Sequence, residues 1–256
     1  MNRKITVLTF ILCILLFLPD AAGQSLWRKR MLESKMPERG LVVLAGGGIA
    51  AIRSDICGTP GCNEFQPVFG IGALYKFDPL WSASINLDYV KLGATEKSPA
   101  RPLDLSFRTE LYEVTGNIHF NLLDAYSGSG GYRSSRKRFV VPYAKFGAGF
   151  IYYTATSYPG TGNLDESQTK YDPEREYPAF GIVIPFGGGL RFRFSDQVSV
   201  APELIYHLTS TDYLDNVGPR LAPGTSRDHY GVASIRLMYT PSIKENIFSR
   251  KAQHGK

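Results

Sequence analysis

The residue types most suggestive of chemistry are three of the four histidines, His119, His207 and His229. His207 is preceded by Glu203 and followed by Ser210 within a few positions. A serine, a histidine and a carboxylate are the components of a nucleophilic catalytic site, in which the histidine takes the proton of the hydroxyl. Whether these residues can act together depends on which face of their element each one occupies.

Two cysteines, Cys57 and Cys62, flank a short stretch that contains Pro60 and Gly61. A Pro-Gly pair favours a turn that can bring the two thiols together, and this predicts a disulfide in an exported protein. Free thiols and a metal site remain as alternatives. The metal site is disfavoured because no histidine or second cysteine pair lies nearby in the sequence. No metal is therefore expected.

Two glycine triplets, at 46–48 and 187–189, resemble phosphate-binding loops in composition only. Neither triplet precedes a helical pattern, and neither carries the Lys-Ser/Thr pair of a P-loop. Glycine inside a strand instead gives curvature and leaves room for neighbouring side chains. We therefore interpret both triplets as strand glycines and expect no nucleotide or other cofactor.

The start of the chain has the features of a secretory signal peptide. Arg3 and Lys4 form a basic start, an apolar run covers 5–18, and small residues at Ala21 and Gly23 provide a cleavage site. The alternative, a membrane-spanning helix, is disfavoured because the run is shorter than the roughly 20 residues that cross a bilayer. The mature chain is therefore expected to be exported.

Eight segments of strand character follow, with no extended linker or low-complexity tract between them. In the third segment, apolar side chains at Trp81, Ile85 and Leu87 alternate with polar ones at Asn86 and Asp88. Successive side chains of a strand point to opposite faces, so this segment has one apolar and one polar face. The expected strands cover 40–52, 66–77, 81–93, 106–122, 140–153, 178–193, 198–211 and 229–240.

Alternating strands fit either a soluble barrel or sandwich with the apolar face inside, or a membrane barrel with that face toward lipid. The membrane barrel is favoured because the number of segments is even and each is long enough to cross a bilayer at a tilt. We therefore predict an all-β protein, an eight-stranded antiparallel transmembrane β-barrel of the outer membrane, in contact with outer-membrane lipid. Aromatic residues that suit interfacial girdles are Phe77, Trp81, Tyr89, Tyr152, Tyr153, Phe194 and Tyr239. Charged residues expected to pair inside the barrel are Asp88, Glu113, Lys145, Arg191, Glu203 and Arg236.

This barrel places His207 and Glu203 on the polar face, inside the lumen. An enzyme that modifies lipid must present its base toward the bilayer, so we interpret His207 as part of a polar network and predict that the protein is not an enzyme. The interior of an eight-stranded barrel is just filled by side chains, which disfavours an open pore. A passive channel, a surface-structural barrel and a lipid-modifying enzyme remain as alternatives.

Connection lengths orient the barrel, because short turns belong on the periplasmic side and long loops outside. Turns at 78–80 and 195–197 are short, and the connection at 123–139 is long although it must lie with them. This long turn carries a net charge of +3, as do the stretches at 24–39 and 242–256, whereas the outer loops are neutral or acidic. The basic residues expected to dock partners in the periplasm are Arg133, Arg136, Lys137 and Arg138. No aromatic stacking platform interleaves with them, so nucleic acid is not an expected partner.

The predicted organisation is therefore a signal peptide at 1–23, a basic periplasmic segment at 24–39, the barrel at 40–241 and a basic periplasmic tail at 242–256.

Four stretches of the barrel resemble a known family. They are Leu74-Tyr75-Lys76-Phe77 with Trp81-Ser82; Leu105-Ser106-Phe107-Arg108 with Glu113 and Phe120-Asn121-Leu122; Pro142-Tyr143 with Phe146-Gly147-Ala148-Gly149; and Ile184-Pro185-Phe186-Gly187-Gly188-Gly189 with Thr211-Asp212-Tyr213-Leu214-Asp215-Asn216-Val217. In their order they resemble the PorG-like outer-membrane barrels of Bacteroidetes, which are associated with the type IX secretion system. The first loop departs from the family pattern, because Arg53 to Glu64 replaces its usual tyrosine and Gly-Asp-Leu-like stretch.

The resemblance implies a structural role in protein secretion. A barrel of this family would tether the periplasmic lipoprotein ring and contact the arms of the inner-membrane motor. The family motif residues that would carry the resemblance most specifically are Ser106, Phe107, Arg108, Thr211, Asp212, Tyr213, Leu214 and Asp215.

Overall fold

The computed structural model describes residues 40–54, 56–57, 60–96, 105–123, 138–159, 175–195, 197–217 and 227–241 of the chain. The signal peptide expected at 1–23, the basic segment at 24–39 and the tail at 242–256 lie outside the described residues. Within the described ranges, no helix has the length and apolar character needed to cross a membrane.

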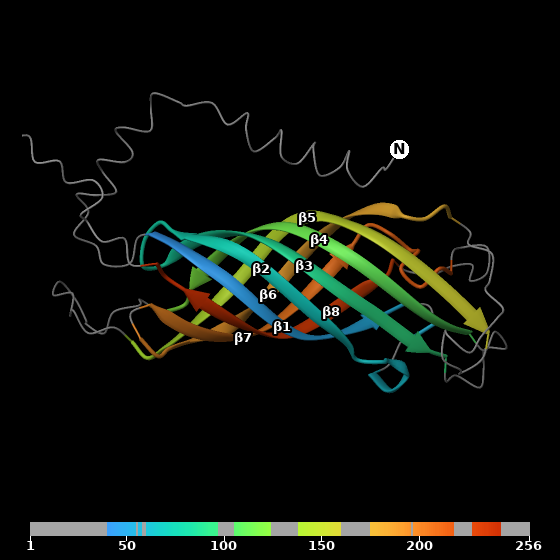
Figure 1. The fold of residues 1–256 in the computed structure, drawn as a ribbon, viewed down its shortest axis with the longest axis horizontal. Coiled ribbons are helices and arrows are strands. Elements are labelled where there is room, and N and C mark those ends of the chain that lie inside the picture. The colour runs from blue at the N-terminus through green and yellow to red at the C-terminus, as the bar shows by residue number, and fades with distance from the viewer. Residues whose placement is uncertain are drawn as a thin grey trace, which may run out of the picture. The chain divides into compact units, whose positions relative to one another are not determined.

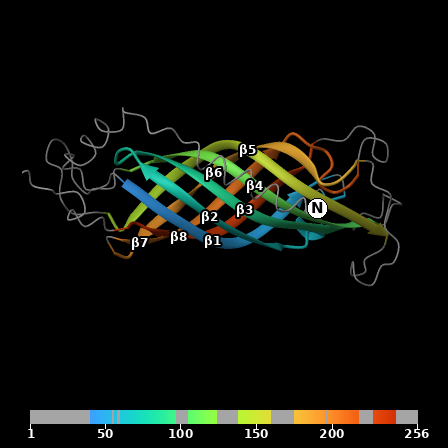
Figure 2. The same ribbon diagram turned by 45° about the horizontal axis from the view of Figure 1, so that its top comes forward.

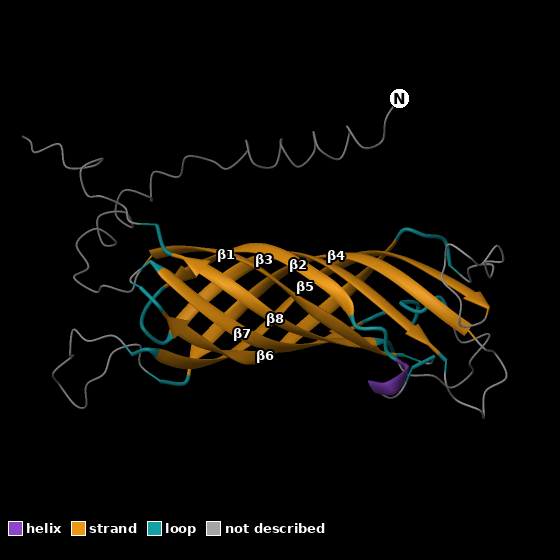
Figure 3. Ribbon diagram, turned by 60° about the horizontal axis from the view of Figure 1, so that its bottom comes forward, coloured by secondary structure: helices purple, strands orange, loops and turns teal. Residues whose placement is uncertain are grey.

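Eight antiparallel strands close into one barrel, in which each strand pairs with its neighbours in the sequence and β8 pairs with β1 (Figure 1). The predicted fold class is confirmed. Figure 2 shows the strands inclined to the long axis of the barrel, as closure of a sheet requires. A short 3-10 helix, η1 (Pro60–Cys62), lies between β1 and β2 and is the purple element of Figure 3. The strands are β1 (Gly40–Arg53), β2 (Gln66–Lys76), β3 (Trp81–Thr95), β4 (Leu105–Asn121), β5 (Val140–Pro159), β6 (Ala179–Arg193), β7 (Val198–Thr209) and β8 (His229–Tyr239).

The expected strand boundaries agree with the structure to within two residues except at β5, which continues to Pro159 instead of ending at residue 153. The pairing of β4 with β5 runs without interruption from Asn121↔Tyr143 to Leu105↔Pro159. Inward-facing residues of this extension, such as Ser157, are buried. The two strands therefore remain paired beyond the point where the apolar alternation of the sequence weakens.

Both short turns lie at one end of the barrel, which the rule of short periplasmic turns assigns to the periplasm, and each turn is closed by a side-chain oxygen. The Asp78 carboxylate accepts hydrogen bonds from the backbone N–H groups of Leu80 at 2.7 Å and Trp81 at 2.8 Å. The Ser195 hydroxyl accepts from the backbone N–H of Val198 at 2.9 Å. Asp and Ser satisfy turn N–H groups in this way, which explains why so few residues suffice to reverse the chain.

The outer surface of the barrel carries a continuous band of large apolar side chains. On β3, Ile85 and Leu87 are exposed, whereas Ser84, Asn86 and Asp88 between and beside them are buried in the lumen. A soluble barrel would show the opposite arrangement, and an apolar exterior is the arrangement of a membrane barrel. Other exposed members of the band are Leu41, Val43, Ile49, Phe69, Ile71, Val114, Ile118, Phe146, Phe150, Phe180, Ile182, Leu204, Ile235 and Leu237.

Aromatic rings border this band at its two ends. Trp81 packs on Phe120 at 4.7 Å near the periplasmic turns, and Tyr89 packs on Tyr112 at 5.1 Å near the outer loops. Tyr153 was also expected in a girdle, and this prediction is wrong: only 1% of the side chain is exposed, inside the barrel. Its neighbour Tyr152 already faces outward, and adjacent residues of a strand cannot share a face. 

The side chains that line the lumen change from polar to apolar at the level of the outer aromatic rings. Inward residues of β3 are polar as far as Asp88 and apolar from Val90 onward. The paired strand β4 changes at the same level, because Glu113 lies opposite Asp88 and Leu111 lies opposite Val90. On the outer surface the polarity changes in the opposite direction, since Leu87 is followed on the same face by Tyr89 and then Lys91.

The barrel is therefore inside-out within the bilayer and has an apolar interior above it. We call the buried ionisable groups that lie next to the apolar interior the charged layer; they are Asp88, Glu113, Lys145, Glu203, His207 and Arg236. The apolar interior above them is the outer core, which includes Ile52, Cys57, Cys62, Val68, Val90, Leu92, Leu105, Phe107, Leu111, Ile151, Tyr153, Leu214, Val217, Tyr230 and Val232.

Candidate functional site

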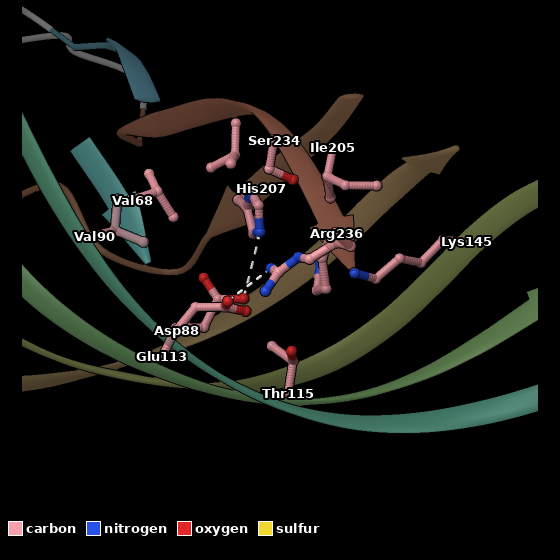
Figure 4. A pocket seen from close by; sticks show the side chains of 12 residues that line it. Val68, Asp88, Val90, Glu113, Thr115, Lys145, Ile205, His207, Ser234 and Arg236 are labelled. Atoms are coloured by element: carbon pink, nitrogen blue, oxygen red, sulfur yellow. Dashed lines mark hydrogen bonds and ion pairs between the residues drawn. The ribbon is translucent and has the colours of Figure 1, made fainter. Parts of the chain in front are cut away.

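The charged layer gathers side chains from five strands around one point of the lumen. Figure 4 shows the carboxylates of Asp88 and Glu113 directed toward the guanidinium of Arg236 and the ring of His207, with Lys145 on the far side. The cavity between these groups measures about 10 Å³, which is room for a single water molecule.

Arg236 and Asp88 form the closest ion pair of the layer, with Nη2 to Oδ1 at 2.6 Å. They come from β8 and β3, which are separated by β1 and β2. The residues between them on the same rung are both glycines, because Arg236 pairs with Gly46, Gly46 with Gly70, and Gly70 with Asp88. A Cβ atom at Gly70 would lie 1.6 Å from Asp88 Oδ1, so the ion pair requires glycine at this position.

A second pair of side chains, Tyr143 and Glu203, also makes contact across an intervening strand where that strand has a glycine. Tyr143 of β5 and Glu203 of β7 are each paired with Gly189 of β6. The Tyr143 hydroxyl donates to Glu203 Oε1 at 2.5 Å, and Lys145 Nζ lies 3.5 Å from Glu203 Oε2. Each glycine triplet of the sequence thus contributes one residue, Gly46 or Gly189, that leaves room for a contact in the lumen. This is the role that the sequence predicts for strand glycines.

His207, the residue considered for catalysis, lies in this layer and faces the lumen. Its Nε2 is 3.3 Å from Glu113 Oε1, and the Tyr230 hydroxyl donates to the other oxygen of the same carboxylate. The ring of His207 stacks on Tyr230 at 4.4 Å. Glu203, the acid nearest in sequence, is engaged by Tyr143 instead. His207 Nδ1 has no hydrogen-bond partner among the described residues.

Two further groups occupy the periplasmic part of the lumen. His119 Nε2 lies 2.9 Å from the Ser84 hydroxyl, and the Arg191 guanidinium packs over the Tyr143 ring at 5.1 Å. Arg191 Nη1 also donates to Asn121 Oδ1 at 3.5 Å. Arg191 therefore lies in the lumen, as the alternation indicates, and these contacts hold it against polar and aromatic groups.

Residues 211–217, which we call the outer stopper, follow β7 and fold back into the barrel at its outer end. Leu214 is fully buried; its carbonyl accepts from the Thr109 hydroxyl of β4, and its N–H donates to the Asp228 carboxylate at 2.8 Å. The Asp215 carboxylate accepts from the backbone N–H of Val217 at 2.9 Å and of Ile56 at 3.4 Å. The stopper is thereby tied to the barrel wall and to the first loop.

The tyrosine between the strands β5 and β6 adds a further tie. The Tyr177 hydroxyl donates to the Tyr213 carbonyl at 3.0 Å. Burial raises the pKa of Tyr177, so the phenol stays protonated and keeps this donor.

Cys57 and Cys62 are joined by a disulfide in the first loop, with their Cα atoms 5.6 Å apart. Both cysteines are buried against the outer core. Asn63 fastens this loop to β1, since its Nδ2 donates to the Ile52 carbonyl at 2.9 Å and its Oδ1 accepts from the Ile52 N–H at 2.6 Å. Among the described residues, no group of three or more His, Cys, Asp or Glu side chains could hold a metal ion.

The motif residues that carry the sequence resemblance lie at the outer end of the barrel, although they are distant in sequence. Phe107 and Leu214 belong to the same apolar cluster of the outer core. Ser106 is buried and donates to the Thr95 hydroxyl at 3.1 Å. The Tyr213 N–H donates to the Thr211 hydroxyl at 3.2 Å. The remaining motif residues are Arg108, on the outward face of β4, and Asp212 and Asp215 of the stopper. Phe107 and Leu214 therefore contribute to the outer core, and the other motif residues lie at the same end of the barrel.

Of the four basic residues expected to dock periplasmic partners, the structure describes Arg138, which is half-buried just before β5. Arg133, Arg136 and Lys137 lie outside the described residues. 

Comparison with known proteins places the barrel in a family. The sequence profile of the outer membrane protein beta-barrel domain matches residues 39–240. No curated protein matches the chain in sequence. Three solved structures illustrate the similar folds. Neisserial surface protein A is 12% identical, with 78% of this chain and 96% of that chain covered and a TM-score of 0.44. Ail of Yersinia pestis, in complex with the heparin analogue sucrose octasulfate, is 14% identical, with coverages of 78% and 96% and a TM-score of 0.43. The outer membrane enzyme PagL is 13% identical, with coverages of 78% and 99% and a TM-score of 0.34.

At these identities and TM-scores, the three solved structures do not indicate an activity for this chain. The family assignment depends on the profile match and on the architecture of the barrel. The matched region contains all eight strands of the barrel. The chain belongs to the outer membrane protein beta-barrel domain family and is a β-barrel of the outer membrane.

Proposed function

We propose that this protein is a closed, non-catalytic structural barrel that holds a docking surface for periplasmic partners in the outer membrane. The filled lumen is the observation that carries the proposal. The charged layer leaves a cavity of about 10 Å³, and the outer core and stopper occupy the lumen above it. 

Closure of this kind argues against a passive channel. An ion passing through the lumen would have to displace Arg236 from Asp88 and Lys145 from Glu203, and separating a buried ion pair costs several kcal/mol. It would then have to pass the packed apolar side chains of the outer core, where a charge is poorly solvated.

The position of His207 argues against a lipid-modifying enzyme. The Glu113–His207 pair is buried in the lumen, and the apolar exterior that meets lipid lies on the opposite face of the same strands. A general base must reach the proton that it removes, to within roughly 3 Å or through one water. A lipid held outside the barrel wall is beyond that reach.

The partner that we propose is the type IX secretion machinery. The sequence resemblance and the basic turn support this choice. Four residues suffice for the turn between β2 and β3, whereas the connection between β4 and β5 extends over 122–139. This connection contains Arg133, Arg136, Lys137 and Arg138, and it joins strand ends on the same side of the barrel as the short turns. Such a turn suits acidic faces of the lipoprotein ring or of the motor arms, because charge complementarity steers association.

A conductance measurement tests closure. The purified protein, reconstituted in planar bilayers beside a known porin as a positive control, should give no steady open-channel current. Stable unitary currents that scale with the number of inserted barrels would contradict the closed-barrel proposal and favour the passive channel.

Co-purification tests docking. We expect replacement of Arg133, Arg136, Lys137 and Arg138 by Ser to leave the barrel folded, as judged by heat-modifiable gel mobility, and to reduce recovery of periplasmic secretion components. The matched control removes four positive charges from the outer loops, by Ser substitution of Lys97, Arg101, Lys170 and Arg220. If the periplasmic variant retains its partners as fully as the control does, the turn is not the docking element, and the general outer-membrane barrel becomes the better description.

A further inference from the structure

A cluster of basic side chains lies on the outer surface of the barrel at the upper edge of the apolar band. Arg53 of β1 and His229 of β8 are direct partners across the two strands and share a face. Arg53 is exposed, and the next residue after His229, Tyr230, points into the lumen, so the shared face is the outward one. Arg227, just before β8, is also exposed. We call Arg53, Arg227 and His229 the outer basic cluster.

The side of the barrel directly below the cluster is apolar. Ile49 of β1 and Leu204 of β7 are exposed on either side of Ala233 of β8, with which both are paired. The cluster therefore lies where the wall passes from the hydrocarbon region to the level of lipid headgroups. Basic side chains at this level attract anionic headgroups.

Contacts within the wall hold His229 in a defined state. Its Nδ1 accepts a hydrogen bond from the backbone N–H of Thr209 at 3.3 Å. In a neutral ring the proton then resides on Nε2, which becomes the free donor. Tyr206 packs against the His229 ring at 6.0 Å and extends across Gly231, where a Cβ would meet it at 3.9 Å. An amphipathic tyrosine in this position is typical of a membrane interface.

The positive charge of the cluster is not compensated by an acidic side chain among the residues that the structure describes. The charges of Arg53 and Arg227 both act on the His229 ring. Neither arginine takes part in an ion pair between described residues. Lys91 on β3 provides a contrast: it is also outward-facing at the upper edge of the band, but its Nζ lies 3.0 Å from Glu110 Oε1.

We propose that the outer basic cluster binds a phosphate group of lipid A, the phosphorylated glycolipid of the outer leaflet. Two guanidinium groups and one imidazole N–H supply donors suited to a phosphate, and arginine binds phosphate oxygens in a bidentate manner. The apolar wall formed by Ile49, Ala233 and Leu204 accommodates the acyl chains below. The proposal is independent of the periplasmic docking function, because it concerns the opposite end of the barrel.

Native mass spectrometry of the full-length folded protein, released from detergent micelles, measures binding of diphosphorylated lipid A directly. The test variant combines Arg53→Gln, Arg227→Gln and His229→Asn, in which the Asn oxygen can replace Nδ1 as acceptor for Thr209. We expect its affinity to fall at least about tenfold, because three donors to the phosphate are removed at once. The control Lys91→Gln, which removes an already paired charge, should stay within about twofold of the wild type.

Two further binding measurements show whether the protein recognises the phosphate group or the acyl chains of lipid A. Dephosphorylated lipid A should bind the wild-type protein as weakly as diphosphorylated lipid A binds the triple variant. Inorganic phosphate alone should not bind measurably, because the acyl chains hold the lipid at the wall. Equal binding of phosphorylated and dephosphorylated lipid A to the wild type overturns the proposal, as does an equal loss with Lys91→Gln. If the triple variant fails to fold, Arg227→Gln alone decides, because Arg227 is exposed and outside the strands. No loss of affinity in that variant would also overturn the proposal.

Discussion

The two regions of the lumen are built from the same strands but held together by different forces. Below the outer aromatic rings, the charged layer is fixed by ion pairs and hydrogen bonds that cross from strand to strand, such as Arg236–Asp88 and Tyr143–Glu203. Above the rings, the outer core is fixed by apolar packing between the wall, the stopper and the disulfide loop. The change takes place within one step of alternation, between Asp88 and Val90.

The surroundings of the wall explain this difference. Lipid surrounds the lower region, so the apolar side chains must face outward and the lumen receives the polar ones, which then need partners. Water surrounds the upper region, so the wall can bury apolar side chains inward and gain the usual hydrophobic stabilisation. Directional contacts make the charged layer sensitive to the loss of one partner, whereas the outer core responds to lost volume.

The largest effect is expected from removing one charge of the charged layer. Arg236→Met leaves the buried carboxylate of Asp88 without its partner, and loss of one member of a buried ion pair costs about 3–5 kcal/mol. Urea unfolding of the reconstituted barrel should show this decrease in the free energy of unfolding. The double variant Asp88→Asn with Arg236→Met should recover part of the loss, because no uncompensated charge remains. A double variant less stable than Arg236→Met would contradict an ion-pair origin.

The next largest effect is expected in the outer core. Leu214→Ala removes a fully buried side chain of the stopper, and such truncations cost about 2–5 kcal/mol. Because the stopper lies above the membrane, we also expect faster proteolysis of the outer loops while the barrel keeps its heat-modifiable mobility. Leu204→Ala is the matched control, since Leu204 is 69% exposed on the lipid-facing surface and fills no protein core. Equal protease sensitivity of the two variants would mean that Leu214 does not hold the mouth closed.

A smaller effect is expected from the glycine that separates Arg236 from Asp88. Gly70→Ala places a methyl group at the position of the Asp88 carboxylate, so the carboxylate must move away from Arg236. Overpacking of this kind costs about 1–3 kcal/mol, measured by the same urea titration. Gly116→Ala is the control, because its Cβ would meet only the Ala148 carbonyl oxygen, at 4.0 Å, among neighbouring atoms. If both alanines have the same effect, backbone entropy and not the ion pair sets the cost.

The fold could be predicted from the sequence because alternation with a period of two is a local signal. Ile85, Asn86, Leu87 and Asp88 already separate an apolar from a polar face, and the number and length of the segments favour lipid on the apolar side. The reversal above Asp88 was also present, since Val90, Leu92 and Ala94 continue the inward face as apolar residues. The reversal is missed when the alternation is considered only within the membrane-spanning part of the strand. 

The partners within the charged layer could not be predicted, because they depend on the register of four or five strands at once. Nothing in the sequence around Gly70 indicates that it lies on one rung with Asp88, Gly46 and Arg236. The same holds for Glu113, which lies 117 residues from its partner Tyr230. Such contacts follow only from closure of the barrel.

The smallest effect on stability is expected from removal of the disulfide, and this effect should be confined to the outer region. The Cys57–Cys62 bridge closes a very short loop, so the entropic model gives it at most about 2 kcal/mol. Replacing both cysteines by Ala should therefore leave insertion and the charged layer unchanged, because the bridge lies between β1 and β2 and outside the strands. The expected local effect is greater protease sensitivity of the first loop, since Ile56 links that loop to the Asp215 carboxylate.

Alkylation followed by mass spectrometry checks the bridge itself: the peptide that contains both cysteines should gain two labels only after reduction. Full labelling without reductant would show that the thiols are free in the native protein. In that case the first loop would depend on Asn63 and the packing of the outer core alone, and the double Ala variant should be no more protease-sensitive than the wild type.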